Sequence, residues 1–214
     1  MASSTGSSTS VWLDDFFASY FRHRPVSATF IGVHDYDDRL PDYSTAAISA
    51  QLSETEQLLA RVDSGAVEPP TTQVEAVDQL LARNYLQTQV WELGDTHIVL
   101  GNPCLYTGEA VFGIVSLFLR DFRPFDERVE AAVTRLVAIP AFLAQGWENV
   151  TSAPAAWVDR AINECDGAVK LLTDGVNVLA ERYGATRQDF LDAAARAADA
   201  FREHRTYCTD VLAP

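Results

Sequence analysis

The segment from Arg24 to Ser44, RPVSATFIGVHDYDDRLPDYS, gathers the side chains best suited to chemistry. It contains a histidine and four aspartates. Histidine can exchange a proton near neutral pH, and clustered carboxylates can hold a cation. Short Asp side chains also cap helices and form hydrogen bonds to the backbone of turns. The residue types therefore favour a polar loop with a structural role. The alternative is a polar loop that faces a ligand.

A cation-binding loop is disfavoured by the spacing of these aspartates. Asp35, Asp37 and Asp38 resemble the start of a calcium loop, but Leu40 and Ala46 stand where the sharp-turn glycine and the bidentate glutamate are required. No second acidic motif on another helix accompanies DYDD, as a magnesium-diphosphate site would need. The sequence therefore predicts no metal ligand here.

Zinc-dependent hydrolysis on a helix commonly uses H-E-x-x-H, in which two histidines project from one face and the glutamate serves as base. The four histidines are followed by Arg24, Asp35, Ile98 and Arg205, so the motif is absent. His204 and Cys208 have the spacing of half a zinc site, but a structural zinc needs four ligands. There is also no G-x-S-x-G nucleophile motif. We predict no catalytic residue and no cofactor in this chain.

The elements that position these residues are predicted to be helices. Apolar residues recur at helical spacing along most of the chain, as at Val11, Trp12, Phe16 and Tyr20. We expect an all-α array of seven or eight mostly long antiparallel helices. Residues 1–10, MASSTGSSTS, are expected to form a flexible polar tail, and residues 11–214 a single helical domain.

Helix boundaries follow from caps and breakers. Pro25 and Gly32 bracket a short helix, and the His34 to Ser44 stretch is predicted to be a loop. Thr72 and Glu75 form a capping-box pattern that opens a long helix. The remaining predicted helices run from Ser44 to about Gly65, from Thr72 to Gly94, over Ala110–Leu119, from about Asp126 with a kink or break at Pro140, from Pro154 to Gly184, and from Thr186 to about Leu212.

Composition narrows the range of partners. The net charge is −14 and the pI near 4.5, which repels nucleic acid and anionic membranes. The longest apolar run, Ala110–Leu119, is about half the ~20 residues that cross a bilayer. Three cysteines without C-x-x-C spacing fit small core residues in a reducing compartment. With no leader-like segment at the start, a cytoplasmic protein is expected.

Three stretches carry a resemblance to a known family. The segment from Phe21 to Ser44 resembles the N-terminal signature of the bacterial DUF885 family, with Arg-Pro, Ala-Thr, Gly, His-x-Tyr-Asp and Leu-Pro-Asp-x-Ser in order. NPCLYTGEAVFGIVSLFLRDF from Asn102 and RLVAIPAFLAQGWENV from Arg135 resemble two later segments of that family. The three matches keep their order over most of the chain.

The resemblance implies a helical protein related to zinc metallopeptidases, whose N-terminal helices wall a substrate cleft. Complete members are much longer and carry H-E-x-x-H in their C-terminal half, so zinc is expected only there and this chain is expected to be inactive alone. His34, Tyr36, Asp37 and Asn102 are the matched polar residues that we hypothesise to bind a peptide-like substrate.

Two readings of the whole chain remain open. It could be the truncated substrate-cleft part of a hydrolase, partnered by a missing catalytic half. It could instead be a free-standing, non-catalytic binding or partner subunit. An apolar surface left by a missing half would favour self-association.

Overall fold

The computed structural model describes residues 8–94, 98–183 and 187–212, and these residues are helical without a strand. The all-α prediction is confirmed. Because α7, η1 and α8 are continuous, and α9 runs on into η2, the described residues form eight helical rods. In chain order the elements are α1 Ser8–His23, α2 Pro25–Ile31, α3 Thr45–Asp63, α4 Gln73–Gly94, α5 Pro103–Val115, α6 Phe125–Asn149, α7 Ala155–Lys170, η1 Leu171–Gly175, α8 Val176–Tyr183, α9 Gln188–Tyr207 and η2 Cys208–Leu212.

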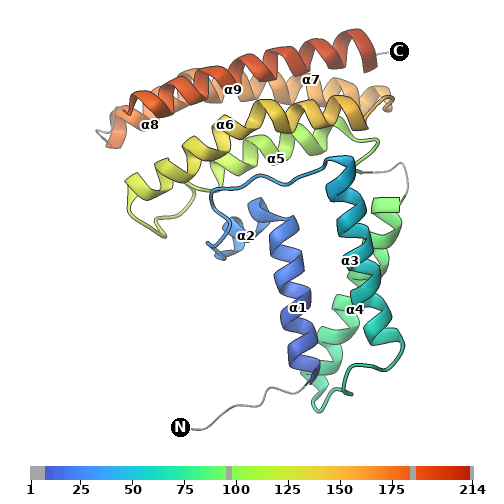
Figure 1. Ribbon diagram of the computed structural model, residues 1–214. Coiled ribbons are helices and arrows are strands. Elements are labelled where there is room, and N and C mark those ends of the chain that lie inside the picture. The colour runs from blue at the N-terminus through green and yellow to red at the C-terminus, as the bar shows by residue number, and fades with distance from the viewer. Residues whose placement is uncertain (1–7, 95–97, 184–186, 213–214) are drawn as a thin grey trace.

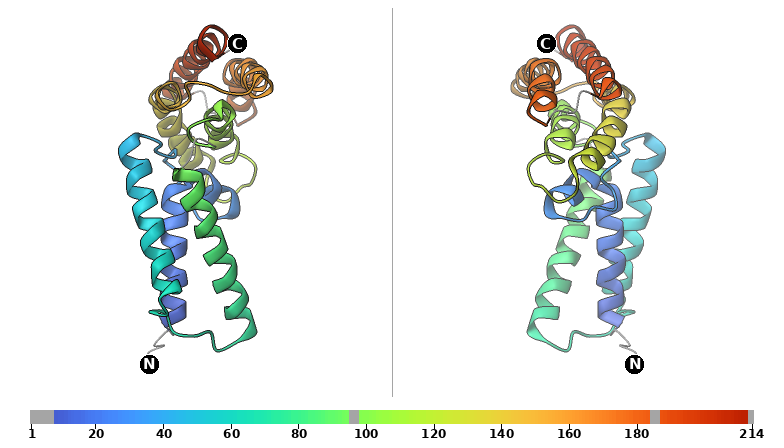
Figure 2. Two further views of the ribbon diagram at one scale, coloured as in Figure 1. Left: turned by 90° about the vertical axis from the view of Figure 1, so that its right-hand side faces the viewer. Right: turned by 90° about the vertical axis from the view of Figure 1, so that its left-hand side faces the viewer.

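The rods form two units set across each other. Helices α1, α3 and α4 stand together as a three-helix bundle, and α5 to α9 lie across its end as a helical layer (Figure 1). When the molecule is turned by 90°, the helices of the layer are seen nearly end-on while those of the bundle stay upright (Figure 2). The short α2 and the segment that follows it lie where the bundle meets the layer.

Each unit has its own apolar core. The layer is built around α6, which packs against α5 and α9, with fully buried Leu136, Ile139 and Leu143 facing its neighbours. The bundle core is smaller and centres on Trp12, Phe16, Leu58 and Leu86. Trp12 is fully buried and its Nε1–H donates to the Leu58 carbonyl at 3.0 Å, which satisfies the indole where it meets no water.

The predicted caps around α2 and α3 are present. Pro25 opens α2, and Gly32 ends it in the left-handed region with φ of 98°, a conformation that favours glycine. The Ser44 hydroxyl accepts from the Ala47 amide at the start of α3. Residues 34–44 form no helix, as predicted.

The start of α4 also follows its predicted signal. The Thr72 hydroxyl accepts from the Glu75 amide at 3.1 Å, which is one half of a capping box. The reciprocal half is displaced by one residue, because the Glu75 carboxylate accepts from the amide and hydroxyl of Thr71. These bonds lower the pKa of Glu75, the Thr71 amide contributing most.

Three predicted boundaries were wrong or fall elsewhere. Helix α5 begins at Pro103, not Ala110, and ends at Val115, because the Asn102 side chain accepts from the Cys104 amide and caps it. Helix α6 runs without a break through Pro140, so the predicted break is wrong and a kink there stays a prediction. Of the predicted tail, residues 1–7 lie outside the described residues, whereas Ser8–Ser10 already belong to α1.

Helix α6 is the one described helix whose length and apolar composition would allow it to cross a membrane. Core helices of packed proteins pass the same test. Here α6 lies between α5 and α9, and its two arginines, Arg128 and Arg135, are buried and hydrogen-bonded. The packing is that of a central core helix.

Candidate functional site at the junction of bundle and layer

The bundle and the layer meet at a corner occupied by Arg24. This residue separates α1 from α2, and its φ of −130° and ψ of 59° lie outside the helical region. A proline disfavours helical geometry in the residue before it, so the Arg24-Pro25 pair accounts for the change of direction. The corner brings the Arg24 side chain against α4.

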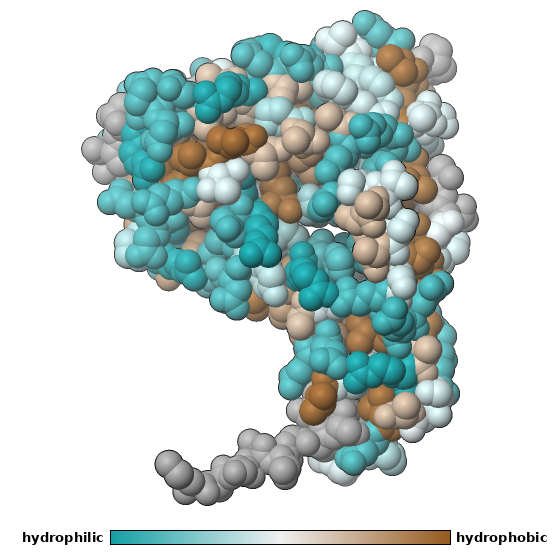
Figure 3. All heavy atoms as spheres, viewed as in Figure 1, coloured by the Kyte–Doolittle hydropathy of each residue, from teal (hydrophilic) through white to brown (hydrophobic). Residues whose placement is uncertain are grey.

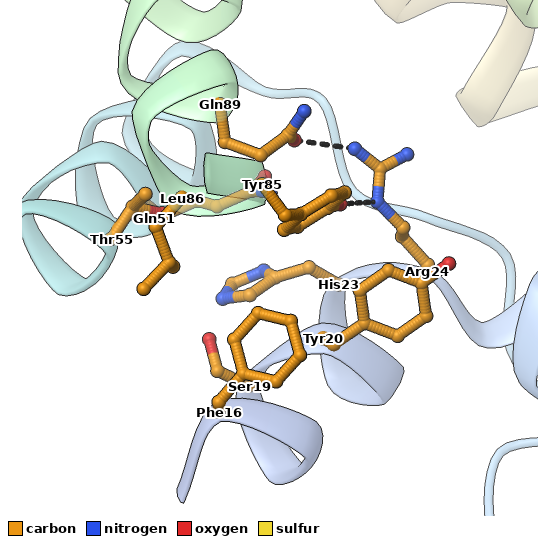
Figure 4. Close-up of a pocket in the computed structure, with 10 residues that line it drawn as sticks. All are labelled: Phe16, Ser19, Tyr20, His23, Arg24, Gln51, Thr55, Tyr85, Leu86 and Gln89. Atoms are coloured by element: carbon orange, nitrogen blue, oxygen red, sulfur yellow. Dashed lines mark hydrogen bonds between the residues drawn. The ribbon is translucent and has the colours of Figure 1, made fainter. Parts of the chain in front are cut away.

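The Arg24 guanidinium is held by two side chains of α4 (Figure 4). Its Nε donates to the Tyr85 hydroxyl at 2.5 Å, and its Nη2 donates to Gln89 Oε1. The guanidinium carbon also lies 5.8 Å from the Tyr20 ring centre and 5.6 Å from that of Tyr85, in the range of cation–π attraction. Nη1 makes no hydrogen bond to a described residue, so part of a rigidly held cation stays available.

Burial and aromatic neighbours act on this arginine in opposite directions. Burial alone would lower the Arg24 pKa, but Tyr85 and Tyr43 outweigh it, and the pKa is raised. Burial raises the pKa of the Tyr85 hydroxyl to about 12. The group therefore carries a permanent positive charge beside neutral phenols.

A cavity of about 210 Å³ lies beside Arg24, and a smaller one of about 20 Å³ adjoins it within the bundle. The space-filling view shows a hollow lined by polar residues where the two units meet (Figure 3). The larger cavity takes residues from both units: His23, Arg24, Tyr43, Gln51, Gln89, Glu92, Leu93, Ile98, Val99 and Leu105.

Carboxylates accompany the cation in the junction. Glu92 accepts from Gln89 Nε2 at 2.6 Å and lines the larger cavity. Glu109 follows Leu105 by one helical turn on α5, which places it on the same face of the helix. Burial raises the pKa of Glu109, although Arg24 and Arg135 act to lower it. Burial raises the pKa of Tyr43, and the charge of Glu109 raises it further.

The polar loop of residues 34–44 is anchored by its own hydrogen bonds and ring contacts. Asp37 is buried, and its Oδ1 accepts from the Thr29 hydroxyl at 2.7 Å. His34 Nδ1 lies 3.1 Å from Asp37 Oδ2, and the imidazole stacks on Phe122 with ring centres 3.8 Å apart. These contacts fix the loop on α2 and on the α5–α6 connection.

Arg135 of α6 holds the loop against the layer. Its side chain is fully buried, and its guanidinium donates to Gly113 O at 2.6 Å, Thr29 Oγ1 at 2.7 Å and Tyr36 O at 3.2 Å. Burial lowers the Arg135 pKa to about 10, and the charge of Asp37 opposes that shift most. Nε of Arg135 is buried without a partner among the described residues. Through these bonds the buried Arg135 links α5, α2 and the loop, and we call this set of contacts the Arg135 clamp.

The four hypothesised substrate residues do not form one site. His34, Tyr36 and Asp37 share the loop, but Tyr36 contributes its carbonyl to Arg135 and its ring to Arg39. Asn102 caps the N-terminal end of α5. The His34 loop lies near the other end of that helix, about 20 Å away at 1.5 Å per residue. Substrate contact by these residues stays a prediction.

The metal sites considered from spacing find no support in the described part of the chain. No group of three or more His, Cys, Asp or Glu side chains there could hold an ion. His204 accepts from Trp147 Nε1 through its Nδ1 at 2.8 Å, and Cys208 is buried in the layer core. All three cysteines are free, and Cys104 is only partly buried.

A family model described as "Bacterial protein of unknown function (DUF885)" matches residues 25–214. The chain belongs to this family. The resemblance read from the three sequence stretches is thereby confirmed at the level of the family, whose description gives no activity. No curated protein matches this chain.

One solved structure shares the fold of this DUF885 chain. It is described as "a putative lipoprotein of unknown function" from Shewanella oneidensis, with a TM-score of 0.80 and 20% identity. The match covers 95% of this chain and 37% of the other. The DUF885 chain thus spans well under half the length of the protein whose fold it shares.

Arg24, Tyr85, Gln89 and Glu109 are the polar residues that the sequence reasoning missed. Arg24 stands in the highlighted stretch, but only as part of a family pattern. Tyr85 and Gln89 are spaced by one helical turn, on the same side of α4 as buried Ala82 and Leu86. The sequence signal for this site was a pair of polar residues on the apolar face of a predicted helix.

Proposed function

We propose that this chain forms the substrate-recognition cleft of a metallopeptidase-like hydrolase, at the junction between bundle and layer. The hydrolase part of the proposal rests on the resemblance to DUF885 and its implied zinc chemistry. The residues of this chain do not fit a catalytic zinc, because no histidine is followed by glutamate and the described residues hold no ligand cluster. The proposed contribution is recognition, with no hydrolytic step.

The observation that carries this proposal is the open side of the Arg24 guanidinium beside a polar cavity. A buried, charge-assisted hydrogen bond to a carboxylate or carbonyl oxygen is worth roughly 1.5 to 3 kcal/mol. Arg24 is already positioned by Tyr85 and Gln89, so a ligand would not have to order it.

The surrounding charges favour a peptide-like ligand. Glu92 lines the same cavity, and Glu109 lies on the adjoining face of α5. A ligand with an oxygen for Arg24 and an ammonium or amide N–H for these carboxyl groups would match both signs of charge. Amino acids and short peptides carry that pair of groups at close spacing, whereas phosphate or fatty acids do not.

Calorimetric titration with a free dipeptide, and with the same dipeptide blocked at both ends, tests this recognition. We expect the wild type to bind the free dipeptide, and Arg24→Gln to weaken the binding at least about tenfold. Arg61→Gln is the matched control, because Arg61 is an exposed arginine of the bundle paired with Asp15.

Arg24 also supports the corner, so circular dichroism must first show that Arg24→Gln keeps its helices. Glu92→Gln provides a second variant in the cavity and should weaken the free dipeptide more than the blocked one. The proposal fails if the wild type binds neither dipeptide, or if Arg24→Gln binds as tightly as Arg61→Gln.

The alternative, a non-catalytic partner subunit, is favoured by an apolar groove between α1 and α4. The groove is lined by Leu13, Phe16, Phe17, Tyr20, Asp78, Leu81, Ala82 and Tyr85, and encloses about 370 Å³. Phe17 is 48% exposed and Leu81 is 61% exposed, which is much for large apolar side chains. Sedimentation over a range of concentrations tests whether this surface drives self-association.

Cytoplasmic placement remains a proposal supported by the cysteines. All three are free, and two are buried in the layer core, which suits a reducing compartment. Fractionation of the native cell followed by immunoblotting tests the compartment. Recovery with the membrane or periplasmic fraction would refute the placement.

A further inference from the structure

A separate cavity lies between α2 and the α5–α6 connection. Its volume is about 140 Å³. The walls combine apolar rings with polar side chains: Thr29, Phe30, Gly32, His34, Ser116, Leu119, Arg120 and Phe122. None of these residues lines the junction cavity.

His34 enters this cavity in a fixed orientation. Nδ1 is held by the Asp37 carboxylate, the ring is stacked on Phe122 with an interplanar angle of 7°, and the His34 carbonyl accepts from Arg123 at 3.2 Å. With Nδ1 committed, Nε2 is the ring atom left to meet a ligand. Nε2 has no partner among the described residues.

Arg120 supplies a cation with all its donors unused. Its guanidinium carbon lies 5.8 Å from the ring centre of Phe30, and its side chain makes no hydrogen bond within the described structure. A cation–π contact at this distance uses none of the N–H donors, which leaves the paired N–H groups of the guanidinium free for a planar anion.

The carboxylates around this cavity are mostly engaged elsewhere. Asp37 is held by Thr29 and His34, and Asp121 is bound by Arg128 Nη2 at 2.7 Å. Asp38 pairs with Arg39 and is exposed. In a chain of net charge −14, the cavity therefore presents an uncommitted arginine and a histidine beside apolar walls.

We infer that this cavity binds a small carboxylate with an apolar substituent, its oxygens paired with Arg120 and its apolar part against Phe30, Leu119 and Phe122. Two parallel N–H groups match a carboxylate, and His34 Nε2 completes the polar side of the cavity. Phe30 is 43% exposed and Leu119 is 53% exposed, so an apolar group would cover surface that water now contacts. The limited volume suits a short acid, free or as the end of a peptide.

The test is a titration of the whole chain with propionate, isobutyrate and phenylacetate, followed by NMR through the His34 ring protons. We expect saturable shifts of these protons, tighter binding of isobutyrate than of propionate, and at least about tenfold weaker binding by Arg120→Gln. Arg39→Gln, which removes an equal charge from the neighbouring loop outside the cavity, should bind as the wild type does.

Arg120→Lys separates charge from shape and should recover only part of the affinity, because an ammonium cannot pair with both carboxylate oxygens. A peptide ending in leucine, compared with its amidated form, tells whether the acid can be a chain terminus. The inference is overturned if none of the three acids shifts His34, if Arg120→Gln binds them unchanged, or if inorganic phosphate binds at the same residues more tightly than isobutyrate.

Discussion

Replacing Asp37 with alanine should destabilise the protein strongly, although the residue stands in a loop. Asp37 is 5% exposed, accepts from Thr29 and holds His34, and its charge lies near the fully buried guanidinium of Arg135. Removing one partner of a buried ionic network costs about 3 to 5 kcal/mol, because the remaining charge is left uncompensated. Arg135 keeps its carbonyl acceptors, so we expect the lower end, about 3 kcal/mol.

Urea unfolding followed by circular dichroism measures this loss. For a chain of this size about 3 kcal/mol corresponds to roughly 6 to 12 °C in Tm. Asp37→Asn keeps the shape but removes the charge, and should lose less than Asp37→Ala. The denaturant slope should stay unchanged, since the loop contributes little to the surface exposed on unfolding.

Asp38→Ala is the matched control, because Asp38 is the next residue in the chain and its side chain is 58% exposed. Exposed substitutions usually change stability by less than ~0.5 kcal/mol. If Asp37→Ala and Asp38→Ala unfold at the same urea concentration, the loop is not anchored by this carboxylate and the clamp around Arg135 has been misread.

Three further predictions concern titration and association. Burial raises the pKa of Glu109 in the folded state, so folding favours the protonated carboxyl group. The stability that this protonation contributes is lost as pH rises. Glu109→Gln should therefore have a higher Tm than the wild type at pH 7 and the same Tm near pH 4. Burial lowers the pKa of His204 from 6.5 to about 4. The free energy of unfolding should therefore fall by about 3 kcal/mol between pH 6.5 and pH 4, because the unfolded state takes up the proton first. Urea unfolding of His204→Gln should show a smaller fall over the same range. Leu81→Glu should abolish concentration-dependent sedimentation if the α1–α4 groove pairs two copies, and a wild type that stays monomeric when concentrated would contradict that role.

Local signals predicted most of the fold. Proline at the start of α2, glycine at its end and hydroxyl caps at α3 and α4 act within one helical turn, so the sequence alone reveals them. Helix α5 starts earlier than predicted, because Asn102 is its cap and Pro103 stands in its first turn, whereas glycine, asparagine and proline in a row are also typical of a loop. The signal for this start is the combination of the two residues, an asparagine cap followed by proline.

The candidate site was harder to predict because its residues come from distant segments. Arg24 meets Gln89 across 65 positions, and Asn102 looked close to the His34 loop only through the family pattern. Clustering of polar residues in sequence drew attention to Asp37, whereas the structure uses that residue to anchor the loop. The sequence shows which residues share a face of one helix, but it does not show which residues of the bundle and the layer come into contact at their junction.

The guanidinium of Arg135 also constrains the order in which the chain can fold. It bonds to Pro25, Thr29 and Tyr36, which precede it by 110, 106 and 99 positions. During synthesis, the contacts of α1, α3 and α4 can form early, whereas these bonds must wait until α6 has left the ribosome. Closure of so long a loop is entropically costly and belongs late in folding. Until then the segment after α2 is held only by local contacts such as that of Asp37 with Thr29, and the nascent chain exposes it.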